Sequence, residues 1–210
     1  MLSNMKLPIE VFTKWAEEGR DEAMAKGHAN SVNAMLDFTF KNIDNRFTFI
    51  DSGCGNGWVV RIVGDHPLCN KAIGVDGSKS MIEKAISIDK KNTYEYEDLI
   101  DWIPDEKVDI VFSMEVFYYV KNPIKLIDHV VKNWLKPTGR LIIGIDYYKE
   151  NKPSESWPLD CGISIMTRLS EKEWSDGFIK SGLVNVLSWR EGQKDKWGGT
   201  LILTGEKDSN

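Results

Sequence analysis

The sequence predicts an α/β fold: a doubly wound, mostly parallel sheet with helices on both faces and an antiparallel hairpin strand at its C-terminal end. Short apolar segments alternate with helical segments through the middle of the chain, which is typical of βαβ crossovers. These apolar segments are continuous rather than alternating, as expected for parallel strands buried on both faces. The last two strand-like segments have no helix between them, which indicates an antiparallel pair.

Each expected element follows from a local pattern. Apolar runs predict strands at 47–52, 71–76, 93–98, 107–114 and 139–147, and the terminal hairpin at 183–190 and 200–206. Helix starts are marked by Ser78, by Asn122 followed by Pro123, and by the capping box that Ser170 opens. The helix that begins at Pro123 is expected to stop at 136–139, which reads K-P-T-G.

Two helices are expected ahead of the first strand, at 8–18 and roughly 28–40, with breaks at Gly19 and Gly27. They resemble a cover rather than part of the sheet. The chain shows no internal repeat and no linker long enough to divide it. We therefore expect one domain over 1–210, in which a helical cover (1–40) precedes the doubly wound core (47–206).

The composition is that of a globular domain and excludes several classes of protein. The chain has 210 residues, a formal net charge of -5 and three widely separated cysteines. The acidic balance argues against a nucleic-acid partner, and the cysteine spacing favours neither a disulfide framework nor a zinc site. The apolar runs fall short of the ~20 residues of a membrane span, and the first residues lack the pattern of a secretory signal. We expect a cytoplasmic protein with no membrane partner.

A glycine-rich loop follows the first strand. Gly53, Gly55 and Gly57 are spaced G-x-G-x-G and precede an apolar helical segment, so a ligand can lie against bare backbone at the start of that helix. Asp76 follows about twenty residues on, at the end of the second strand, where a carboxylate can accept hydrogen bonds from both hydroxyls of a ribose. Together, the loop and Asp76 predict a site for a ribose-containing cofactor.

The loop resembles the first motif of the class I S-adenosylmethionine-dependent methyltransferases, which is an acidic residue followed by x-G-x-G-x-G. The residues that match this motif are Asp51, Gly53, Cys54, Gly55 and Gly57. The likeness continues through 74–78, 97–98, 109–115 and 135–141, and leaves 1–40 and 148–169 unexplained. The resemblance implies a Rossmann-like sheet, S-adenosylmethionine as cofactor and in-line methyl transfer to a small-molecule acceptor.

The resemblance also implies roles for individual residues. Asp51 would hold the ammonium of the cofactor, Asp76 its ribose, and Met81 its adenine unless it is plain core. Asp98, or less readily Glu97, would meet the exocyclic amine of the adenine, and Ser113 and Met114 would lie near the sulfonium. The full set expected to bind the cofactor is Asp51, Gly53, Cys54, Gly55, Gly57, Asp76, Gly77, Met81, Glu97, Asp98, Leu99, Ser113 and Met114.

The segment after the fourth strand departs from the family pattern. Small-molecule members often read E-V-x-x-H-V there, whereas residues 115–120 read E-V-F-Y-Y-V, so Tyr119 takes the usual histidine position. A phenol is a poor base at neutral pH unless its pKa is lowered. The candidate catalytic residues are Tyr119, Glu115 and Tyr147, with a solvated strand-end charge as the alternative for Glu115. The three histidines do not cluster, so no metal site is expected.

The acceptor is expected to meet the loop at 146–157, which is long, aromatic and at the end of a central strand. Tyr118, Tyr119, Tyr147 and Trp157 could surround a cationic amine or stack on a planar ring. The residues expected to bind the acceptor are Trp15, His28, Tyr118, Tyr148 and Trp157. Residues 1–40 and 146–157 are expected to form a lid that orders with ligand, with a permanent plug as the alternative.

Two other functions remain open from the sequence. A nicotinamide-dinucleotide-dependent oxidoreductase would share the sheet and the ribose acid, but its fingerprint is G-x-G-x-x-G rather than G-x-G-x-G. A methyltransferase-like binding protein would keep the cofactor site and perform no transfer. The sequence does not choose among nitrogen, oxygen and sulfur acceptors, and it does not decide whether the chain dimerises.

Overall fold

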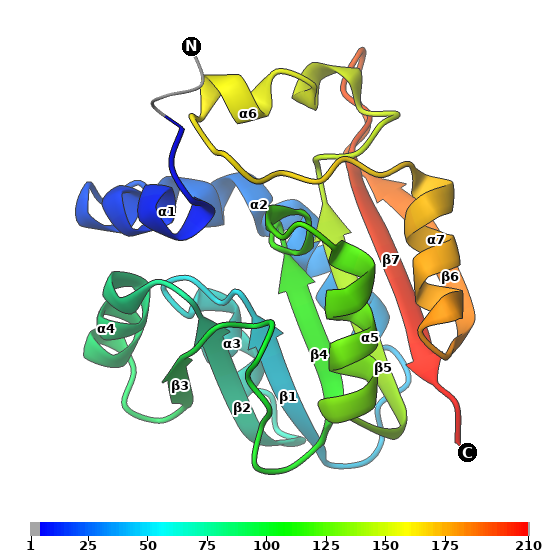
Figure 1. The fold of residues 1–210 in the computed structure, drawn as a ribbon. Helices are drawn as coiled ribbons and strands as arrows, with labels where there is room; N and C mark the ends of the chain where they lie inside the picture. Colours follow the sequence, from blue (N-terminus) through cyan, green and yellow to red (C-terminus); the bar gives the residue numbers. More distant parts are fainter. Residues whose placement is uncertain (1–4, 210) are drawn as a thin grey trace.

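The computed structural model describes residues 5–209, which form a seven-stranded sheet with helices on both faces (Figure 1). The strands are β1 (Phe47–Ser52), β2 (Cys69–Asp76), β3 (Thr93–Tyr96), β4 (Val108–Met114), β5 (Leu135–Ile145), β6 (Leu183–Glu191) and β7 (Thr200–Lys207). The α-helices are α1 (Pro8–Glu17), α2 (Asp21–Phe40), α3 (Trp58–Gly64), α4 (Lys79–Ile88), α5 (Pro123–Asn133), α6 (Trp157–Asp160) and α7 (Glu171–Lys180). Two short 3₁₀ turns are η1 (Phe117–Tyr119) and η2 (Lys152–Ser154).

The strand order across the sheet is β3-β2-β1-β4-β5-β7-β6. β1 pairs in parallel with β2 and β4, β2 with β3, and β4 with β5, whereas β7 runs antiparallel between β5 and β6. The sheet is therefore doubly wound, mostly parallel and closed at one side by an antiparallel hairpin, and the predicted fold class is confirmed. The strand order reverses between β1 and β4, and in such sheets the crevice at this switch point is the usual ligand site.

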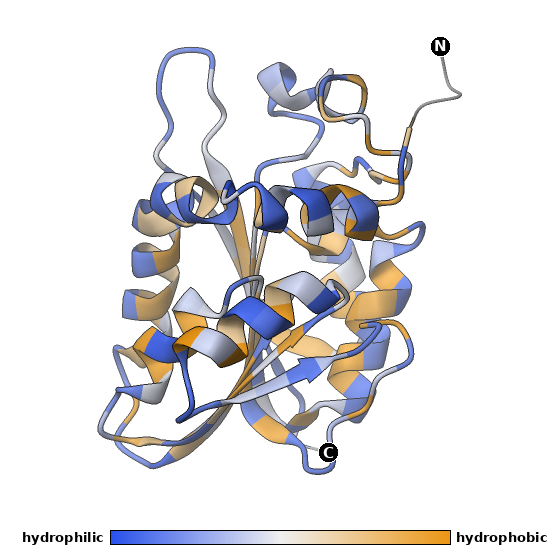
Figure 2. Cartoon of the chain, turned by 90° about the vertical axis from the view of Figure 1, so that its left-hand side faces the viewer, coloured by the Kyte–Doolittle hydropathy of each residue, from blue (hydrophilic) through white to orange (hydrophobic). Residues whose placement is uncertain are grey.

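Each face of the sheet carries a hydrophobic core (Figure 2). In β1, Phe49 packs with side chains of α2 and α3, whereas its neighbour Ile50 packs with those of α5 and α7. In β7, Ile202 and Leu203 divide between the two faces in the same way. Because both faces are covered by helices, the strands need apolar residues at consecutive positions, and this is the continuous pattern seen in the sequence.

The helix starts expected from capping residues are confirmed. The Ser78 hydroxyl accepts a hydrogen bond from the Met81 amide at 3.4 Å and begins α4. Asn122 accepts from the Lys125 amide at 3.1 Å, with Pro123 as the first residue of α5. Reciprocal bonds between residues 170 and 173 form the capping box of α7. Local chemistry alone therefore fixes where these three helices begin.

The predicted boundary of the second N-terminal helix is wrong. α2 begins at Asp21 rather than near residue 28, and Gly27 lies inside it. A glycine within a helix costs about 1 kcal/mol relative to alanine but does not break it when the surrounding residues pack. Here Val32, Met35 and Leu36 are buried against the sheet. The second half of α2 is thus part of the core, and α1 alone has the character of a separate cover.

Two strand boundaries also differ from expectation. β5 starts at Leu135, so residues 136–139 lie within the strand instead of ending a helix. Thr138 has a left-handed φ of 63°, and the pairing of β4 with β5 shifts register near this point, which lets the strand absorb the proline and glycine. β3 ends at Tyr96, so Glu97 and Asp98 lie in the loop that follows.

Within residues 5–209, no helix combines the length and the apolar character that crossing a bilayer requires.

Candidate active site

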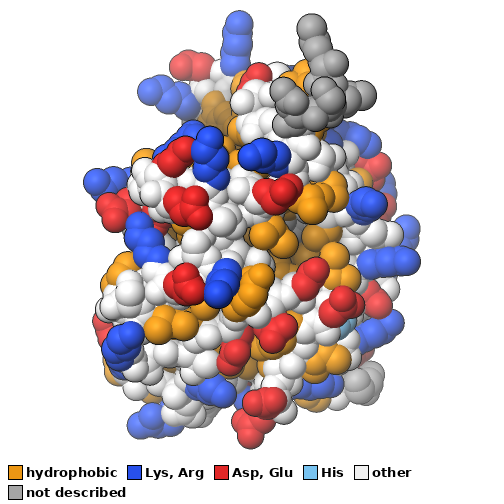
Figure 3. Space-filling view, turned by 60° about the vertical axis from the view of Figure 1, so that its left-hand side comes forward, with side chains coloured by type: hydrophobic (Ala, Val, Ile, Leu, Met, Phe, Trp, Pro, Cys, Tyr) orange, Lys and Arg blue, Asp and Glu red, His pale blue; other side chains and the backbone are white. Residues whose placement is uncertain are grey.

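A cavity of about 860 Å³ opens at the carboxyl ends of β1, β2 and β4, where the strand order reverses. Its floor comes from the loops that follow the first four strands, and α1, α2 and α5 form its sides. On the face that carries α1 and α4, hydrophobic side chains gather among charged ones (Figure 3). The cavity therefore combines an apolar lining with a few polar groups from strand ends, as small-molecule sites usually do.

The glycine loop forms the tight end of the cavity. Gly53 and Gly57 have left-handed φ values of 77° and 75°, which glycine adopts without strain. A Cβ on Gly53 would come within 2.2 Å of Val116, and one on Gly57 within 2.4 Å of Tyr94. Gly55 is different, because the nearest atom to a Cβ there would be 3.9 Å away. The loop is closely packed at its two ends and open at its centre.

Two carboxylates lie at this end of the cavity. Asp76 accepts hydrogen bonds from the amides of Ser78 at 2.7 Å and Gly55 at 2.9 Å, which ties β2 to the glycine loop. Burial raises the pKa of Asp76, and the two backbone bonds partly offset that rise. Burial, together with the nearby Asp76 charge, raises the pKa of Asp51 to about 8. A cationic group placed here would favour ionisation of Asp51.

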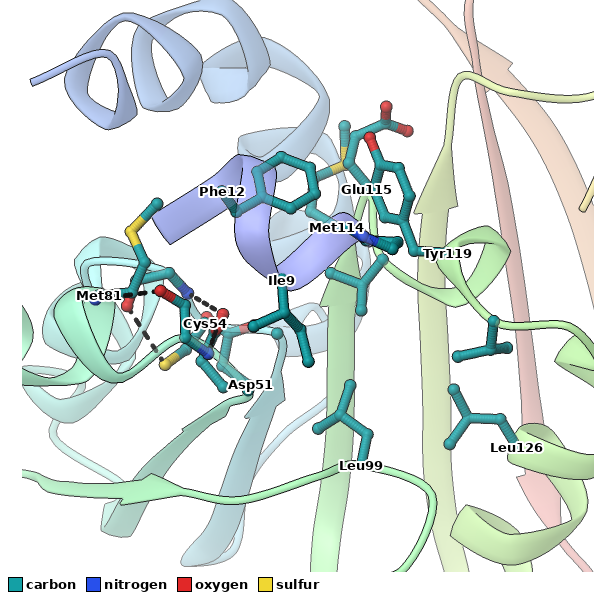
Figure 4. Close-up of a pocket in the computed structure, with 18 of the residues that line it drawn as sticks. Ile9, Phe12, Asp51, Cys54, Met81, Leu99, Met114, Glu115, Tyr119 and Leu126 are labelled. Carbon is teal, nitrogen blue, oxygen red and sulfur yellow. Dashed lines mark hydrogen bonds between the residues drawn. The ribbon is translucent and has the colours of Figure 1, made fainter. Parts of the chain in front are cut away.

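Helix α1 lies across the mouth of the cavity. Figure 4 shows Ile9 and Phe12 of α1 between the glycine-loop side chains and the residues that follow β4. A Cβ on Gly77 would lie 2.9 Å from the Ile9 Cδ1 atom, so this glycine allows α1 to approach closely. The Thr13 and Ser78 hydroxyls lie 2.9 Å apart and link α1 to the start of α4.

A buried polar cluster fastens the start of α2 to the same loop. Asp21 accepts hydrogen bonds from the Asn56 amide group at 2.7 Å and from the Lys84 ammonium at 2.9 Å. Burial would raise the pKa of Asp21, but the bonds to Lys84 and Asn56 outweigh it and lower that pKa. Asp21 therefore joins α2, the glycine loop and α4 at one corner of the cavity.

Most of the residues expected to bind the cofactor line this one cavity. Those brought together are Asp51, Gly53, Cys54, Gly55, Asp76, Gly77, Met81, Asp98, Leu99 and Met114. Three others are elsewhere. Gly57 forms the N-cap of α3 and faces Tyr94, and Glu97 lines a separate, smaller cavity beside β3. The Ser113 hydroxyl donates to the Ser52 carbonyl at 2.7 Å, so it links β4 to β1 rather than facing the cavity.

Of the residues expected to act in catalysis or to bind the acceptor, some line the cavity and others do not. Glu115, Tyr119 and His28 line the cavity, and burial lowers the pKa of His28. The residues that the structure does not bring to the cavity are Trp15, Tyr118, Tyr147, Tyr148 and Trp157. Tyr118 and Tyr148 are fully buried, and the Tyr148 hydroxyl donates to the Gly198 carbonyl at 2.8 Å. The expectation that these two side chains contact the acceptor does not fit this arrangement.

The remaining aromatic side chains stack on one another. Tyr147 stacks on Trp157 with ring centres 6.5 Å apart, and Trp157 stacks on Trp197 at 6.0 Å. Trp15 of α1 packs edge-on against Phe12 and lies under the guanidinium of Arg20. The aromatic box expected from the sequence exists only in part, because these rings satisfy each other instead of facing the cavity.

The environments of Glu115 and Tyr119 exclude one alternative for each residue. Burial, helped by the charge of Asp146, raises the pKa of Glu115, so this residue is not a solvated strand-end charge. Burial and the nearby Glu115 raise the pKa of Tyr119, which is the opposite of what a phenolate base would need. Tyr119 can therefore carry or donate a proton but cannot act as an ionised base.

Several cavity residues were not foreseen from the sequence, namely Ile9, Phe12, Asp21, Asn56, Val116 and Lys125. The apolar positions of α1 were visible, but nothing local showed that they face a ligand site rather than the core. Asp21 lies in the stretch between Gly19 and Gly27, where the sequence predicts a break and not the start of a helix. The position of Val116 depends on a turn after β4 that has no sequence signature.

The residues present fit a nucleoside cofactor with a cationic end. Gly55 leaves open space beside the backbone, so a ligand can lie against it. Asp76 is placed for ribose hydroxyls, and burial with the nearby Asp76 charge raises the pKa of Asp51, so a cationic group beside it would stabilise its ionised form. Asp98 and Leu99, from the loop after β3, line the same cavity and could contact a base.

This fold and this site define a class I S-adenosylmethionine-dependent methyltransferase. A family model described as a methyltransferase domain matches residues 18–188. The chain belongs to this family. S-Adenosylmethionine is accordingly its cofactor.

The relatives agree on the family and differ in acceptor. A trans-aconitate 2-methyltransferase from Rhizobium rhizogenes is 31% identical over 136 residues, which cover 64% of this chain and 49% of the relative. A ribosomal protein L11 methyltransferase from Burkholderia lata is 24% identical over 121 residues, covering 58% of this chain and 39% of the relative. The chain thus spans about half or less of the length of these relatives.

Two solved structures extend the comparison. A Haloferax volcanii methyltransferase in complex with the activator Trm112 gives a TM-score of 0.80 at 26% identity, covering 94% of this chain and 97% of the other. The N-methyltransferase NodS from Bradyrhizobium japonicum, in complex with S-adenosylhomocysteine, gives 0.64 at 15% identity, covering 85% and 86%. At 15% identity, the likeness to NodS shows the fold alone.

Proposed function

We propose that the protein transfers the methyl group of S-adenosylmethionine to a small-molecule acceptor held in the cavity described above. The single observation that carries this proposal is the convergence of Asp51, Asp76 and the open glycine loop in one large cavity. A volume of about 860 Å³ exceeds what one nucleoside requires and leaves room for a second small molecule.

Each cavity residue then has a positioning task. Asp51 pairs with the ammonium of the cofactor, Asp76 accepts from the ribose hydroxyls, and Asp98 with Leu99 meets the adenine. When bound, the cofactor supplies an electrophilic methyl group on a sulfonium. The chain must hold the acceptor atom in line with that methyl group and keep water away, because alignment supplies most of the rate in such displacements.

Exclusion of water falls to α1. Ile9 and Phe12 cover the cavity, and Phe12 packs edge-on against Tyr119 with ring centres 4.9 Å apart. The amide of Lys6 donates to the Gly162 carbonyl at 2.9 Å, so the segment before α1 touches the region that follows α6. This bond holds the start of α1 against the segment that leads to α7, and a lid formed by the N-terminal helices and the 146–157 loop stays a prediction.

A screen with isotopically labelled methyl donor tests the proposed function. The protein is incubated with a cell extract that has been separated into small molecules, protein and RNA, and the label is located in each fraction. We expect label in the small-molecule fraction. Label only in protein or RNA would overturn the small-molecule acceptor, and bound cofactor with no label in any fraction would favour a non-catalytic binding protein.

The same screen can also test whether the enzyme requires a protein partner. The Haloferax neighbour was solved with Trm112, and the L11 relatives are named for a protein acceptor. The screen is therefore repeated after coexpression with a Trm112-type activator. Copurification of the two chains, with methyl transfer only by their complex, would show that the active enzyme is the complex and not this chain alone.

A further inference from the structure

A series of hydrogen-bonded, buried polar side chains leads from the cavity into the protein beside β4. Glu115 lines the cavity and follows β4 directly, with a left-handed φ of 61° that is strained for a residue other than glycine. Its amide donates to the Gly144 carbonyl at 2.8 Å, and its Oε1 atom accepts from the Asp146 amide at 2.5 Å. These bonds turn the carboxylate toward the end of β5 and away from water.

Two tyrosine hydroxyls connect this carboxylate to the cavity wall. The Tyr118 hydroxyl donates to the Glu115 Oε2 atom at 2.5 Å and lies 3.3 Å from the Tyr119 hydroxyl. The contact at 3.3 Å has the geometry of a bond donated by Tyr118 to Tyr119, and one phenol proton serves only one acceptor at a time. Inward proton transfer therefore requires the Tyr119 hydroxyl to turn toward the Tyr118 oxygen. Tyr119 lines the cavity, and Figure 4 shows its hydroxyl turned to the same end as the Glu115 carboxylate.

The charges around these hydrogen-bonded side chains favour the protonated form of Glu115. Burial, then the Asp146 charge, raises the pKa of Glu115, and burial raises the pKa of Asp146 to about 6. The pKa values of Tyr118 and Tyr119 are raised by burial and by Glu115, and Cys161 also faces Tyr119. Among residues 5–209, no basic side chain forms an ion pair with Glu115 or Asp146.

We propose that Glu115, acting through Tyr118 and Tyr119, takes up the proton that the acceptor releases during methyl transfer. The acceptor is then a molecule whose methylated atom carries a proton, such as an amine or an alcohol, and not a carboxylate. This inference rests on the proposed function. In these terms Tyr119 touches the acceptor, whereas Tyr118 and Glu115 act through it.

The step balances without any further reactant. The lone pair of the acceptor atom forms the bond to the methyl carbon, and the carbon–sulfur bond breaks with its electron pair left on sulfur. The acceptor proton passes to the Tyr119 oxygen, the Tyr119 proton to Tyr118, and the Tyr118 proton to the Glu115 carboxylate. The positive charge of the sulfonium and the negative charge of Glu115 disappear together, and both tyrosines end as neutral phenols.

A carboxylate acceptor would not need the proton relay formed by Tyr119, Tyr118 and Glu115. Such an acceptor is already ionised at neutral pH and releases no proton when it is methylated. It would also carry a negative charge toward Glu115 and Asp146, neither of which forms an ion pair within the described residues. The buried acids therefore distinguish this site from one built for an acid such as trans-aconitate, the acceptor named for the Rhizobium relative.

The test combines the chemistry of the product with a pH profile. The full chain, a cell extract and labelled methyl donor at saturation are incubated, and the product is treated with mild alkali. A methyl ester would release its label as volatile methanol, whereas methylated amines and ethers keep theirs. The variants are Glu115→Gln and Tyr118→Phe. The matched control is Glu171→Gln, which removes a carboxylate bonded to Ser188 and Arg190 on the surface of α7.

We expect alkali-stable label and a wild-type rate that rises with pH and then levels off. Glu115→Gln should lower the rate by about 10²-fold, within the usual range for losing a general base, and remove this rise. Tyr118→Phe, which keeps the carboxylate and its backbone bonds, should also flatten the profile, and the control should not. Alkali-labile label, or variants that keep the wild-type profile, would overturn the inference. Loss of cofactor binding in the wild-type protein would instead overturn the proposed function.

Discussion

At the scale of single residues, Asp76 carries the clearest expectation. Its carboxylate is held by two backbone amides beside the open glycine loop, so two ribose hydroxyls can donate to it. Asp76→Ala should weaken cofactor binding by roughly 1.5 to 3 kcal/mol, the range for hydrogen bonds to a charged group. Isothermal titration with S-adenosylhomocysteine measures the loss.

Glu97 supplies the control for this measurement. It is an acid only one strand away, but it faces the smaller cavity beside β3. Glu97→Gln should leave the affinity unchanged. An Asp76 variant that folds and binds as tightly as the wild type would show that the ribose lies elsewhere, and equal losses in both variants would point to a general charge effect.

The environment of Asp51 predicts that cofactor binding releases a proton. Burial and the Asp76 charge raise its pKa to about 8, so the free protein holds a proton on this carboxyl at pH 7. The cofactor ammonium favours the ionised form, so binding should release a proton and affinity should fall as the pH drops below 8. Calorimetry at pH 7 in two buffers of different ionisation enthalpy measures this release. Equal heats in both buffers would contradict it, and Asp51→Asn should abolish any difference.

The sequence could identify the acids of the cofactor site because each lies within two residues of the end of a strand. It could not separate Ser113 from Met114, since the choice between facing the cavity and bonding to β1 depends on the register of β4 with β1. It also could not show that Tyr118 is buried. That follows from the turn after Glu115, whose left-handed backbone has no sequence signature.

At the scale of elements, α1 and α2 should respond differently to the cofactor. α1 is held across the cavity by contacts with α4 and the residues after β4, among them the Thr13–Ser78 bond and the packing of Phe12 on Tyr119, and it lies outside the sheet core. The second half of α2 is core. Hydrogen exchange should therefore show protection of 8–17 that rises when S-adenosylhomocysteine binds, with residues 31–40 protected throughout. Equal protection of 8–17 with and without ligand would support a permanent plug instead.

The same contrast predicts two kinds of mutational effect. Phe12→Ala should lower the methyl transfer rate while changing the free energy of unfolding by less than about 1 kcal/mol, because this ring is only half-buried. Met35→Ala in α2 should cost about 2 to 5 kcal/mol of stability, since its side chain is fully buried against the sheet. Thermal unfolding and initial rates separate the two. A Phe12 variant that is as active as the wild type would remove α1 from the mechanism.

The boundaries of α2 and β5 show where element prediction from sequence reaches its limit. Capping residues located α4, α5 and α7 because a cap is a local interaction. The breaks predicted at Gly27 and near Thr138 are wrong because tertiary contacts offset the conformational cost of these residues. The contacts are those of α2 with the sheet for Gly27, and the pairing of β5 with its neighbours for Thr138. Tertiary contacts of this kind outweigh local propensity.

At the scale of the whole molecule, the order of the strands explains the position of the site. The reversal between β1 and β4 leaves a crevice at their carboxyl ends, and the loops after the first four strands all meet there. The alternation of strands and helices was enough to predict this edge as the functional one. The covering role of α1 was expected, but the residues that it contributes depend on how α1 packs against the start of α4 and the residues after β4.

The most direct test of the account is a calorimetric titration of the wild-type protein with S-adenosylhomocysteine and, in a separate run, with nicotinamide adenine dinucleotide. Both ligands carry an adenosine, but only the first carries the ammonium that Asp51 would meet. We predict one-to-one binding of S-adenosylhomocysteine and no measurable heat with the dinucleotide. Binding of the dinucleotide without binding of S-adenosylhomocysteine would contradict the account.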